Sequence, residues 1–380
     1  MRQQLMHKKV VLLILYIFVS LSCADEHINR EVYAYYQKWK QTYLISEKSA
    51  LYRIATDKVD KHRTVSEAQG YGMLITSMMA EDKDSQMIFD GLWLFSRAHP
   101  SAICKDLMTW EVPEKKGEND SAFDGDADIA YALIVADKRW GSKGKVNYKK
   151  EAHQVLDAIW KHTIGKDSYL PLLGDWVDPN GKKYNQYTTR TSDFMPGHFK
   201  TFYRFSGDKK WLKVVKAIEY AMLDVQHPKT GLIPDFIKHD VKTKRFVPVE
   251  EGFLEHHDGE YYYNACRVPF RIGVDALNND SLVSKKIVQK LSHWSKAISG
   301  NDPLKIKSGF KLDGTVIGDY FSIVFTAPLG VAAMSDDRAW AKKIYDNIKN
   351  RHENYYEDSV ALLSMFAMSG YFIDPTKMVK

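Results

Sequence analysis

Apolar residues recur along most of this 380-residue chain at the three-to-four-residue spacing of an α-helix. In one segment, the apolar side chains that share a single helical face are Tyr148, Ala152, Val155, Leu156, Ile159 and Trp160. The same spacing predicts twelve helices, over residues 31–45, 66–80, 84–99, 126–138, 148–162, 195–205, 208–226, 264–278, 281–298, 319–333, 337–349 and 356–370. Such a chain is typical of a helical barrel or solenoid, and twelve helices suit six hairpins that close into a ring.

Strand patterns are few. Residues 245–249 are apolar enough for a short strand, and residues 231–234 suit a small hairpin segment. The longest helix-poor stretches, at 100–125, 164–194 and 228–263, are expected to form the walls of a binding cleft. Because no Pro/Gly/Ser-rich linker interrupts the chain after residue 30, we expect one domain over residues 25–380.

The N-terminus has the pattern of a secretory signal peptide. Three basic residues precede the apolar run 10–21, which is short for a membrane span and ends in small residues. Cleavage after Ala24 predicts a secreted, extracellular protein. An alternative is lipoprotein processing before Cys23, which would anchor the protein at the outer face of the cell membrane. Membrane contact is therefore expected only if Cys23 is lipidated.

Charge and cysteine content narrow the classes of partner. Loss of residues 1–24 removes three basic residues and no acidic residue, which lowers the formal net charge from +6 to +3. This bias is too weak to indicate nucleic-acid binding. Cys104 and Cys266 then remain, either as a disulfide or as two buried free thiols. We expect a monomer.

A first candidate motif lies at residues 66–73, with the sequence SEAQGYGM. Ser66 is expected to cap a helix, with Gln69 completing a capping box, so that Glu67 lies in the first turn. The helix dipole favours the ionised form of Glu67, whereas a proton donor needs a raised pKa. Burial of Glu67 and a second carboxylate nearby would raise its pKa. The alternative is that Glu67 serves only to stabilise the helix dipole.

A second candidate motif holds three alternating aspartates, Asp124, Asp126 and Asp128. It fails as a calcium loop, because Ile129 occupies the position that needs glycine and Val135 the position that needs glutamate. One or two aspartates suffice to cap the following helix. Three exceed that need, which indicates that at least one is functional.

These two motifs, together with residues 266–271 (CRVPFR), resemble glycoside hydrolase family 8. The resemblance implies an all-α (α/α)6 barrel that hydrolyses β-1,4-linked polysaccharides with inversion, and its helix count agrees with the periodicity. Glu67 matches the family's general acid, and Asp124 matches the aspartate that holds the distorted sugar at the central subsite. Phe123 departs from the Ser or Thr usually found before that aspartate.

The general base is expected outside both motifs. Asn264 stands where many family members carry an aspartate base, and an amide cannot take a proton from water. The resemblance includes a subgroup, containing chitosanases and some β-glucanases, in which a glutamate of a preceding loop is the base. Glu255 is our candidate, with Asp258 and Glu260 as alternatives. Inversion needs the two carboxyl groups roughly 6.5–9.5 Å apart.

Further residues are expected to bind the polysaccharide. They comprise the motif residues Tyr71, Asp126, Asn264 and Arg267, and Trp110 and Trp176 as stacking platforms in helix-poor stretches. The adjacent His256 and His257 lack the spacing of a metal site, and the chemistry needs neither metal nor cofactor.

The substrate is less sharply indicated than the reaction. Chitosan and β-glucan of the cellulose or lichenan type are the main candidates, and xylan or the producing cell's own exopolysaccharide are alternatives. A polycationic chitosan chain prefers an acidic cleft, for which the acidic residues at 120–128 and 250–260 are candidates. Phe123 and Asn264 also motivate a different class, a cell-surface barrel that binds polysaccharide without cutting it.

Overall fold

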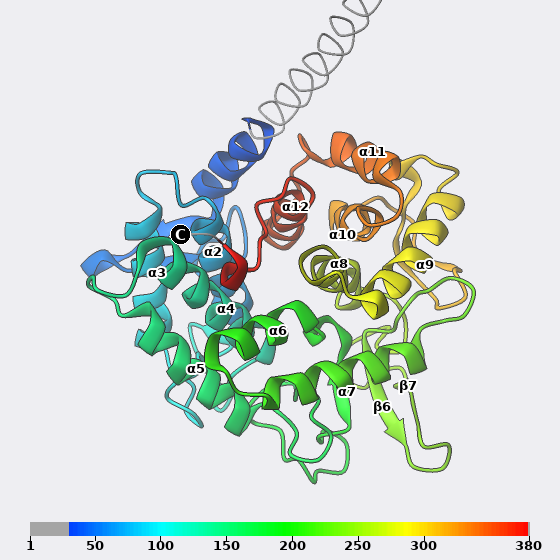
Figure 1. The fold of residues 1–380 in the computed structure, drawn as a ribbon, viewed down its shortest axis with the longest axis horizontal. Helices are drawn as coiled ribbons and strands as arrows, with labels where there is room; N and C mark the ends of the chain where they lie inside the picture. The colour runs from blue at the N-terminus through cyan, green and yellow to red at the C-terminus, as the bar shows by residue number, and fades with distance from the viewer. Residues whose placement is uncertain (1–29, 379–380) are drawn as a thin grey trace, which may run out of the picture.

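The computed structural model describes residues 30–378, so the predicted signal peptide and Cys23 lie outside the described residues. Within this range the chain forms twelve α-helices (Figure 1). The first covers residues 30–43, and the others are α2 (Ser66–Met78), α3 (Ser85–Ala98), α4 (Phe123–Trp140), α5 (Tyr148–His162), α6 (Pro196–Ser206), α7 (Lys210–Val225), α8 (Val268–Asn279), α9 (Leu282–Ile298), α10 (Ile323–Ala333), α11 (Arg338–Ile348) and α12 (Tyr355–Met368). The predicted number and order of helices are confirmed.

Six alternate helices form a closed inner ring. Contacts run from α2 to α4, α6, α8, α10, α12 and back to α2, while α3, α5, α7, α9 and α11 pack outside them (Figure 1). The sequence of each helix matches its position. The inner helix α10 is apolar on nearly all sides and is buried at every residue, whereas the outer helix α11 is apolar on one face and buries only that face. The fold is the expected (α/α)6 barrel.

Short antiparallel strands lie in the connections between helices. They pair as β1 (Leu44–Ser46) with β2 (Tyr52–Ile54), β3 (Thr64–Val65) with β4 (Glu111–Val112), β5 (Thr188–Arg190) with β6 (Phe236–Asp240), β6 with β7 (Arg245–Pro248), and β8 (Ser308–Phe310) with β9 (Val316–Gly318). The strand predicted at 245–249 is present. The prediction of a hairpin segment at 231–234 was wrong: the partner strand begins at Phe236, after Pro234, which has no amide hydrogen to donate to a strand.

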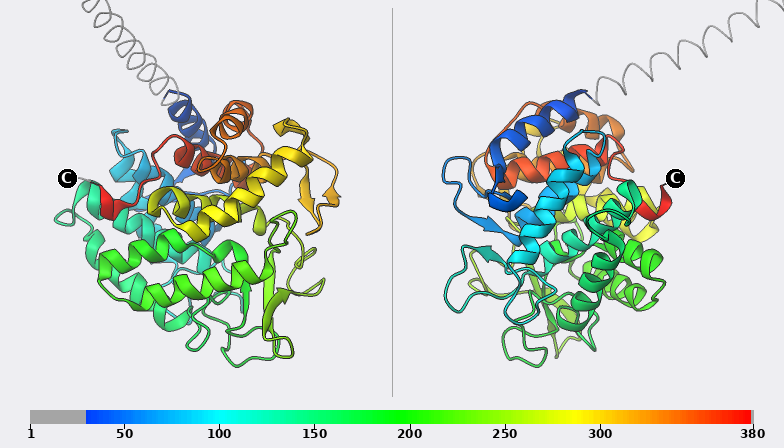
Figure 2. Two further views of the ribbon diagram at one scale, coloured as in Figure 1. Left: turned by 45° about the vertical axis from the view of Figure 1, so that its right-hand side comes forward. Right: turned by 90° about the vertical axis from the view of Figure 1, so that its left-hand side faces the viewer.

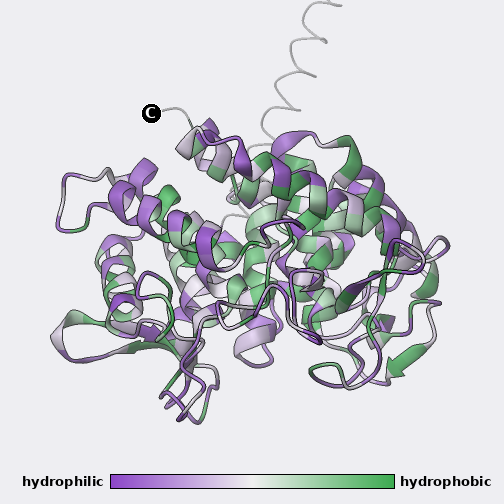
Figure 3. Ribbon diagram, turned by 90° about the horizontal axis from the view of Figure 1, so that it is seen from below, coloured by the Kyte–Doolittle hydropathy of each residue, from purple (hydrophilic) through white to green (hydrophobic). Residues whose placement is uncertain are grey.

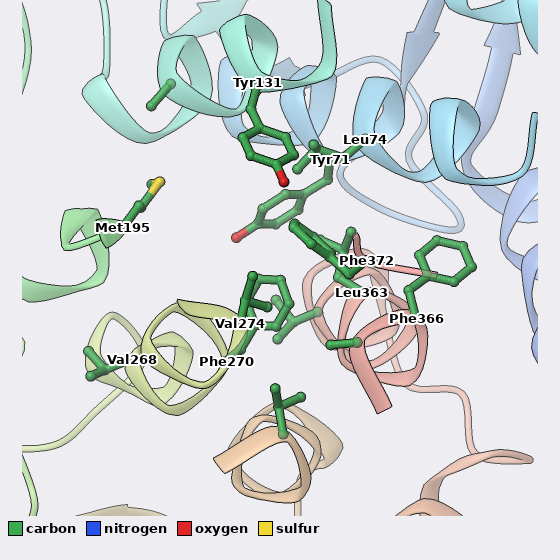
Figure 4. Close-up of a cluster of buried hydrophobic side chains, with 14 of the residues drawn as sticks. Tyr71, Leu74, Tyr131, Met195, Val268, Phe270, Val274, Leu363, Phe366 and Phe372 are labelled. Atoms are coloured by element: carbon green, nitrogen blue, oxygen red, sulfur yellow. The ribbon is translucent and has the colours of Figure 1, made fainter. Parts of the chain in front are cut away.

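Two hydrophobic clusters lie behind the site. The larger runs through the helical ring, and Figure 4 shows side chains of several helices converging around Tyr71. The smaller cluster lies under the loops that follow α5 and β7, and includes Leu173, Phe236 and Phe253. These loops and the β6–β7 pair lie on the same side of the ring (Figure 2), where hydrophilic connections face the viewer in Figure 3.

The first helix packs against the last one, α12, which closes the ring through its contact with α2. Trp39 donates its indole hydrogen to Ser359 Oγ at 2.9 Å, and the Tyr43 hydroxyl donates to Asp358 at 2.8 Å. Both partners lie on α12, so the beginning and the end of the described chain pack together. Within residues 30–378 no helix combines the length and hydrophobicity that a membrane span requires.

Cys104 and Cys266 are both free and buried. Of the two states considered from the sequence, the structure shows two separate thiols.

Candidate active site

Glu67 lies in the first turn of α2, where the preceding strand β3 delivers it. The Ser66 amide donates to the Trp110 carbonyl at 2.9 Å, which continues the β3–β4 pairing up to the start of the helix. The predicted capping box was wrong. Ser66 is already helical, and the Gln69 amide donates to the carbonyls of Tyr52 and Leu92 instead of turning back to the cap. Tertiary hydrogen bonds therefore replace the local ones.

Asp124 comes to the same place from the start of α4. This helix begins at Phe123, three residues earlier than predicted, which puts Asp124 in its first turn. Phe123 is buried and stacks on Phe199 at a centroid distance of 6.1 Å. Gly125 faces Ser66 so closely that an added Cβ would lie 2.5 Å from the Ser66 carbonyl carbon. The two helix starts therefore meet, each presenting a carboxylate.

Around these carboxylates lies a pocket of about 400 Å³. Its charged lining residues are Arg63, Glu67, Asp124, Arg190, Glu255 and Arg267. Its aromatic lining residues are Trp110, Tyr263, Tyr355 and Tyr356, and Asn264 also lines it. The structure thus brings together Glu67, Asp124, Glu255, Trp110, Asn264 and Arg267 of the residues predicted from the sequence.

Arg267 joins the acidic residues of the two motifs. Its Nη1 donates to Glu67 Oε2 at 2.5 Å and to Asp124 Oδ2 at 2.9 Å. The hydroxyl of Tyr355 donates to the other Glu67 oxygen at 2.8 Å, and Arg190 lies 3.4 Å from Asp124 Oδ1. Both carboxylates are therefore held in fixed orientation, while the Glu67 side chain keeps 17% of its surface open to the pocket.

The two carboxyl groups have opposite titration behaviour. Burial raises the pKa of Glu67; Arg267 opposes this effect, and the negative charge of Asp124 adds to it. Burial also acts to raise the pKa of Asp124, but Arg190 and Arg267 outweigh it and lower that pKa to about 2. One group is thus biased toward keeping a proton and the other stays ionised, so the same pocket offers a proton donor and a fixed negative charge.

Glu255 reaches the pocket on a loop whose backbone is held by a buried aspartate. The buried carboxylate of Asp258 accepts the backbone amides of Leu254 and Glu255, both at 3.0 Å from Oδ2. Two residues before Glu255, Phe253 is buried in the smaller hydrophobic cluster. Glu260 accepts the Leu312 amide at 2.8 Å. The carboxylates of Asp258 and Glu260 are therefore engaged in holding backbone, and Glu255 is the acidic residue of segment 250–260 that lines the pocket.

Asn264 lines the pocket with its side chain already bonded. Its Nδ2 donates to Asp235 at 3.2 Å, and its Oδ1 accepts from Arg267 Nη2 at 3.2 Å. The Asp235 carboxylate also accepts the amides of Tyr262, Asn264 and Ala265. In this structure Asn264 orients Arg267 and holds the turn before α8.

Three residues predicted to bind substrate lie outside this pocket. Tyr71 is 1% exposed and packs in the barrel core (Figure 4). Asp126 is buried and accepts the Met108 amide at 2.9 Å, so it fixes the loop before β4. Trp176 packs edge-on against Tyr184 at a centroid distance of 5.2 Å. Tyr71 and Trp176 serve in packing and Asp126 anchors a loop, and the Tyr71 hydroxyl also accepts a hydrogen bond from Arg267 Nη1 at 3.3 Å. Their positions in a motif or loop gave no information on the direction of the side chain.

The acidic residues at 120–128 do not make the cleft acidic. Asp124 lies between two arginines, and Asp128 forms a bidentate ion pair with Arg271 beneath the site, at 2.6 and 2.7 Å. In the second acidic segment, Glu250 pairs with Lys238 away from this pocket. The pocket lining holds three arginines beside three carboxylates.

Sequence reasoning missed Arg190, Tyr355 and Tyr356. Arg190 ends β5 in a stretch expected to form a cleft wall, and the two tyrosines begin the last helix. The Tyr-Tyr pair at a helix start is the available signal for the latter, but only ring closure places it beside Glu67. Across the described residues, no group of three or more His, Cys, Asp and Glu side chains is arranged to hold a metal ion.

Comparison with known proteins agrees with this geometry. The sequence pattern described as "Glycosyl hydrolases family 8" matches residues 3–370. The chain is 39% identical to an endoglucanase of Bacillus sp. (strain KSM-330), over 93% of this chain and 78% of that protein, and 39% identical to a beta-glucanase of Niallia circulans, over 93% and 88%. The apo structure of a beta-1,3-1,4-glucanase from Paenibacillus sp. X4 superposes with a TM-score of 0.87 at 35% identity, covering 91% of this chain and 93% of that one. The chain belongs to glycosyl hydrolase family 8.

Proposed function

We propose that this protein is an endo-acting β-glucanase that cleaves β-1,4 bonds with inversion of configuration. The observation that carries the proposal is a single pocket lined by Glu67, whose pKa is raised, by ionised Asp124, and by Glu255 on a fixed loop. An inverting glycosidase requires one protonated and one ionised carboxyl group on opposite faces of the sugar.

In this mechanism each residue has one role. Glu67 donates its proton to the glycosidic oxygen as the bond to the sugar breaks. Glu255 removes a proton from the water that attacks the opposite face of the ring. This is the role expected of the subgroup that carries Asn at the position of Asn264. Asp124 stays ionised between two arginines and accepts hydrogen bonds from the distorted sugar. The chemistry assigns no role to a metal or cofactor.

The pocket favours β-glucan over chitosan. Chitosan carries an ammonium on each sugar, and three arginines line the pocket. The carboxylates that line it are Glu67, Asp124 and Glu255, and the first two are already paired with arginines. The names of the two relatives at 39% identity, an endoglucanase and a beta-glucanase, support the same substrate class. The N-terminal sequence pattern also supports secretion after cleavage of residues 1–24, or lipid anchoring at Cys23 as the alternative.

The test compares Glu67→Gln and Glu255→Gln with wild type on mixed-linkage glucan, carboxymethylcellulose, chitosan and xylan. We expect each variant to lose at least about a hundredfold in kcat on glucan, since each removes one acid–base group. Proton NMR of early product should show the α-anomer. Glu260→Gln is the matched control: its amide oxygen still accepts the Leu312 amide, and activity should persist.

Each outcome has a distinct meaning. Near-normal turnover of Glu67→Gln would overturn the acid assignment, and near-normal turnover of Glu255→Gln alone would overturn the base assignment. A wild-type protein that binds these glycans and releases no product would instead be a non-catalytic binding barrel.

A further inference from the structure

Two cations flank Trp110 at the end of the pocket formed by β3 and β4. The guanidinium carbon of Arg63 lies 5.7 Å from the centroid of the Trp110 ring, and Lys115 Nζ lies 5.6 Å from it. Both cations lie over the ring, so a sugar that approaches Trp110 comes into contact with positive charge. We call Arg63, Trp110 and Lys115 the cationic rim.

A buried carboxylate holds both cations in place. Glu111 forms an ion pair with Arg63 and another with Lys115, the latter at 2.8 Å. The Glu111 side chain is 4% exposed, whereas those of Arg63 and Lys115 are 47% and 60% exposed. The negative charge thus lies beneath the surface and the two positive charges at it, so the face presented to solvent has a surplus of positive charge.

The cationic rim is next to the proposed acid. Val65 pairs with Glu111 across the β3–β4 ladder, and the Ser66 amide donates to the Trp110 carbonyl. Glu67 directly follows Ser66, so one hydrogen bond and one peptide bond separate Trp110 from the acid. Arg63 and Trp110 line the same pocket as Glu67. A glucan chain in the pocket therefore extends within reach of the rim.

We propose that the cationic rim is a subsite for anionic substituents on the glucan chain, such as carboxylates. This inference rests on the proposed function and specifies which glucans the site prefers. An anionic group over Trp110 would accept charge-assisted hydrogen bonds from cations that Glu111 already holds in position, so little side-chain freedom is lost on binding. An ammonium group, as on chitosan, would be repelled there.

The test measures kcat/KM on carboxymethylcellulose relative to neutral mixed-linkage glucan. We expect Lys115→Gln and Arg63→Gln each to lower this ratio about two- to fivefold at low salt, the range for a partly exposed charge pair. Lys115→Arg should restore the ratio because it restores the charge. Added salt should bring wild type toward the variants, since it screens exposed charges.

Lys342→Gln is the matched control, because Lys342 is an exposed lysine paired with Asp346 on the outer helix α11. An unchanged ratio in both rim variants would overturn the inference, and so would an equal decrease in Lys342→Gln, which would show an effect of net charge alone. A wild-type enzyme that cleaves neither substrate would instead count against the proposed function. Lys115 is exposed, so its substitution keeps the test valid if Arg63→Gln fails to fold.

Discussion

The protonation of Glu67 depends on its burial, which raises its pKa, and on neighbours with opposing effects. Asp124 favours the protonated form by its negative charge, whereas Arg267 and the Tyr355 hydroxyl favour the ionised form. Since Arg267 contacts both carboxylates, removal of Asp124 would also leave it free to bind Glu67 alone. The alkaline limb of the pH profile of kcat/KM, where Glu67 loses its proton, should therefore shift when one of these contacts is removed.

We predict that Asp124→Asn and Tyr355→Phe shift this limb in opposite directions. Loss of the Asp124 charge lowers the pKa of Glu67, so the proton is lost at lower pH and the alkaline limb of kcat/KM moves toward acid. Loss of the Tyr355 hydroxyl removes a hydrogen bond to the ionised form, so the limb moves toward alkali. The measurement is kcat/KM on mixed-linkage glucan as a function of pH.

The pair of variants is its own control, since a general disturbance of the site would not move the limb both ways. An unshifted limb in both variants would show that another group sets it, and a shift of both in the same direction would contradict the opposing effects of Asp124 and Tyr355 on Glu67.

At this scale the sequence predicted residues that belong to local motifs and missed those that tertiary structure delivers. Glu67, Asp124 and Arg267 are recognisable because their neighbours in sequence are distinctive. Arg190 and Tyr355 have no such surroundings. Asp126 shares the motif of Asp124 yet points to the Met108 amide, because two residues along a helix turn a side chain to the opposite face.

At the scale of elements, the site depends on how closely α2 and α4 approach. Apolar spacing predicted both helices, but not that their first turns touch at Gly125 and Ser66. The predicted start of α4 was too late because residues 124–126, Asp-Gly-Asp, have the sequence of a polar turn. In the structure these residues form the first turn of the helix, since Phe123 and Ala127 on either side of them are buried. Packing overrides local preference at this helix start.

We predict that Gly125→Ala lowers both stability and kcat. The added methyl would meet the Ser66 backbone, so the helix starts must separate and the carboxyls of Glu67 and Asp124 move apart. Overpacking of this kind costs about 1–3 kcal/mol in free energy of unfolding. Urea denaturation and steady-state kinetics on mixed-linkage glucan measure the two effects.

Gly144→Ala is the control, because an added Cβ there has no atom within 4 Å, and its stability and activity should match wild type. Wild-type stability and turnover in Gly125→Ala would show that the two helix starts are not held by close packing.

At the scale of the whole molecule, the barrel is closed by segments from opposite ends of the described chain. The helix at 30–43 packs on α12, and α12 begins with Tyr355 and Tyr356, which line the pocket. The helix count predicted the ring, but no local pattern shows which helices meet at its closure. One hydrophobic cluster includes both Val32 and Phe372, so the core is continuous across the place where the ring closes.

Trp39 is the side chain on which this closure can be tested. It is 1% exposed and bonded to Ser359, so Trp39→Ala should lower the free energy of unfolding by about 3–5 kcal/mol, as for a large buried aromatic. Tyr33→Ala, on the same helix but 44% exposed, should change it by less than about 0.5 kcal/mol.

Because one core spans the ring, urea unfolding of both variants should remain a single transition, with loss of helical circular dichroism and loss of glucanase activity at the same midpoint. Activity that survived to higher urea than the helical signal in Trp39→Ala would show that the site does not need the closed ring.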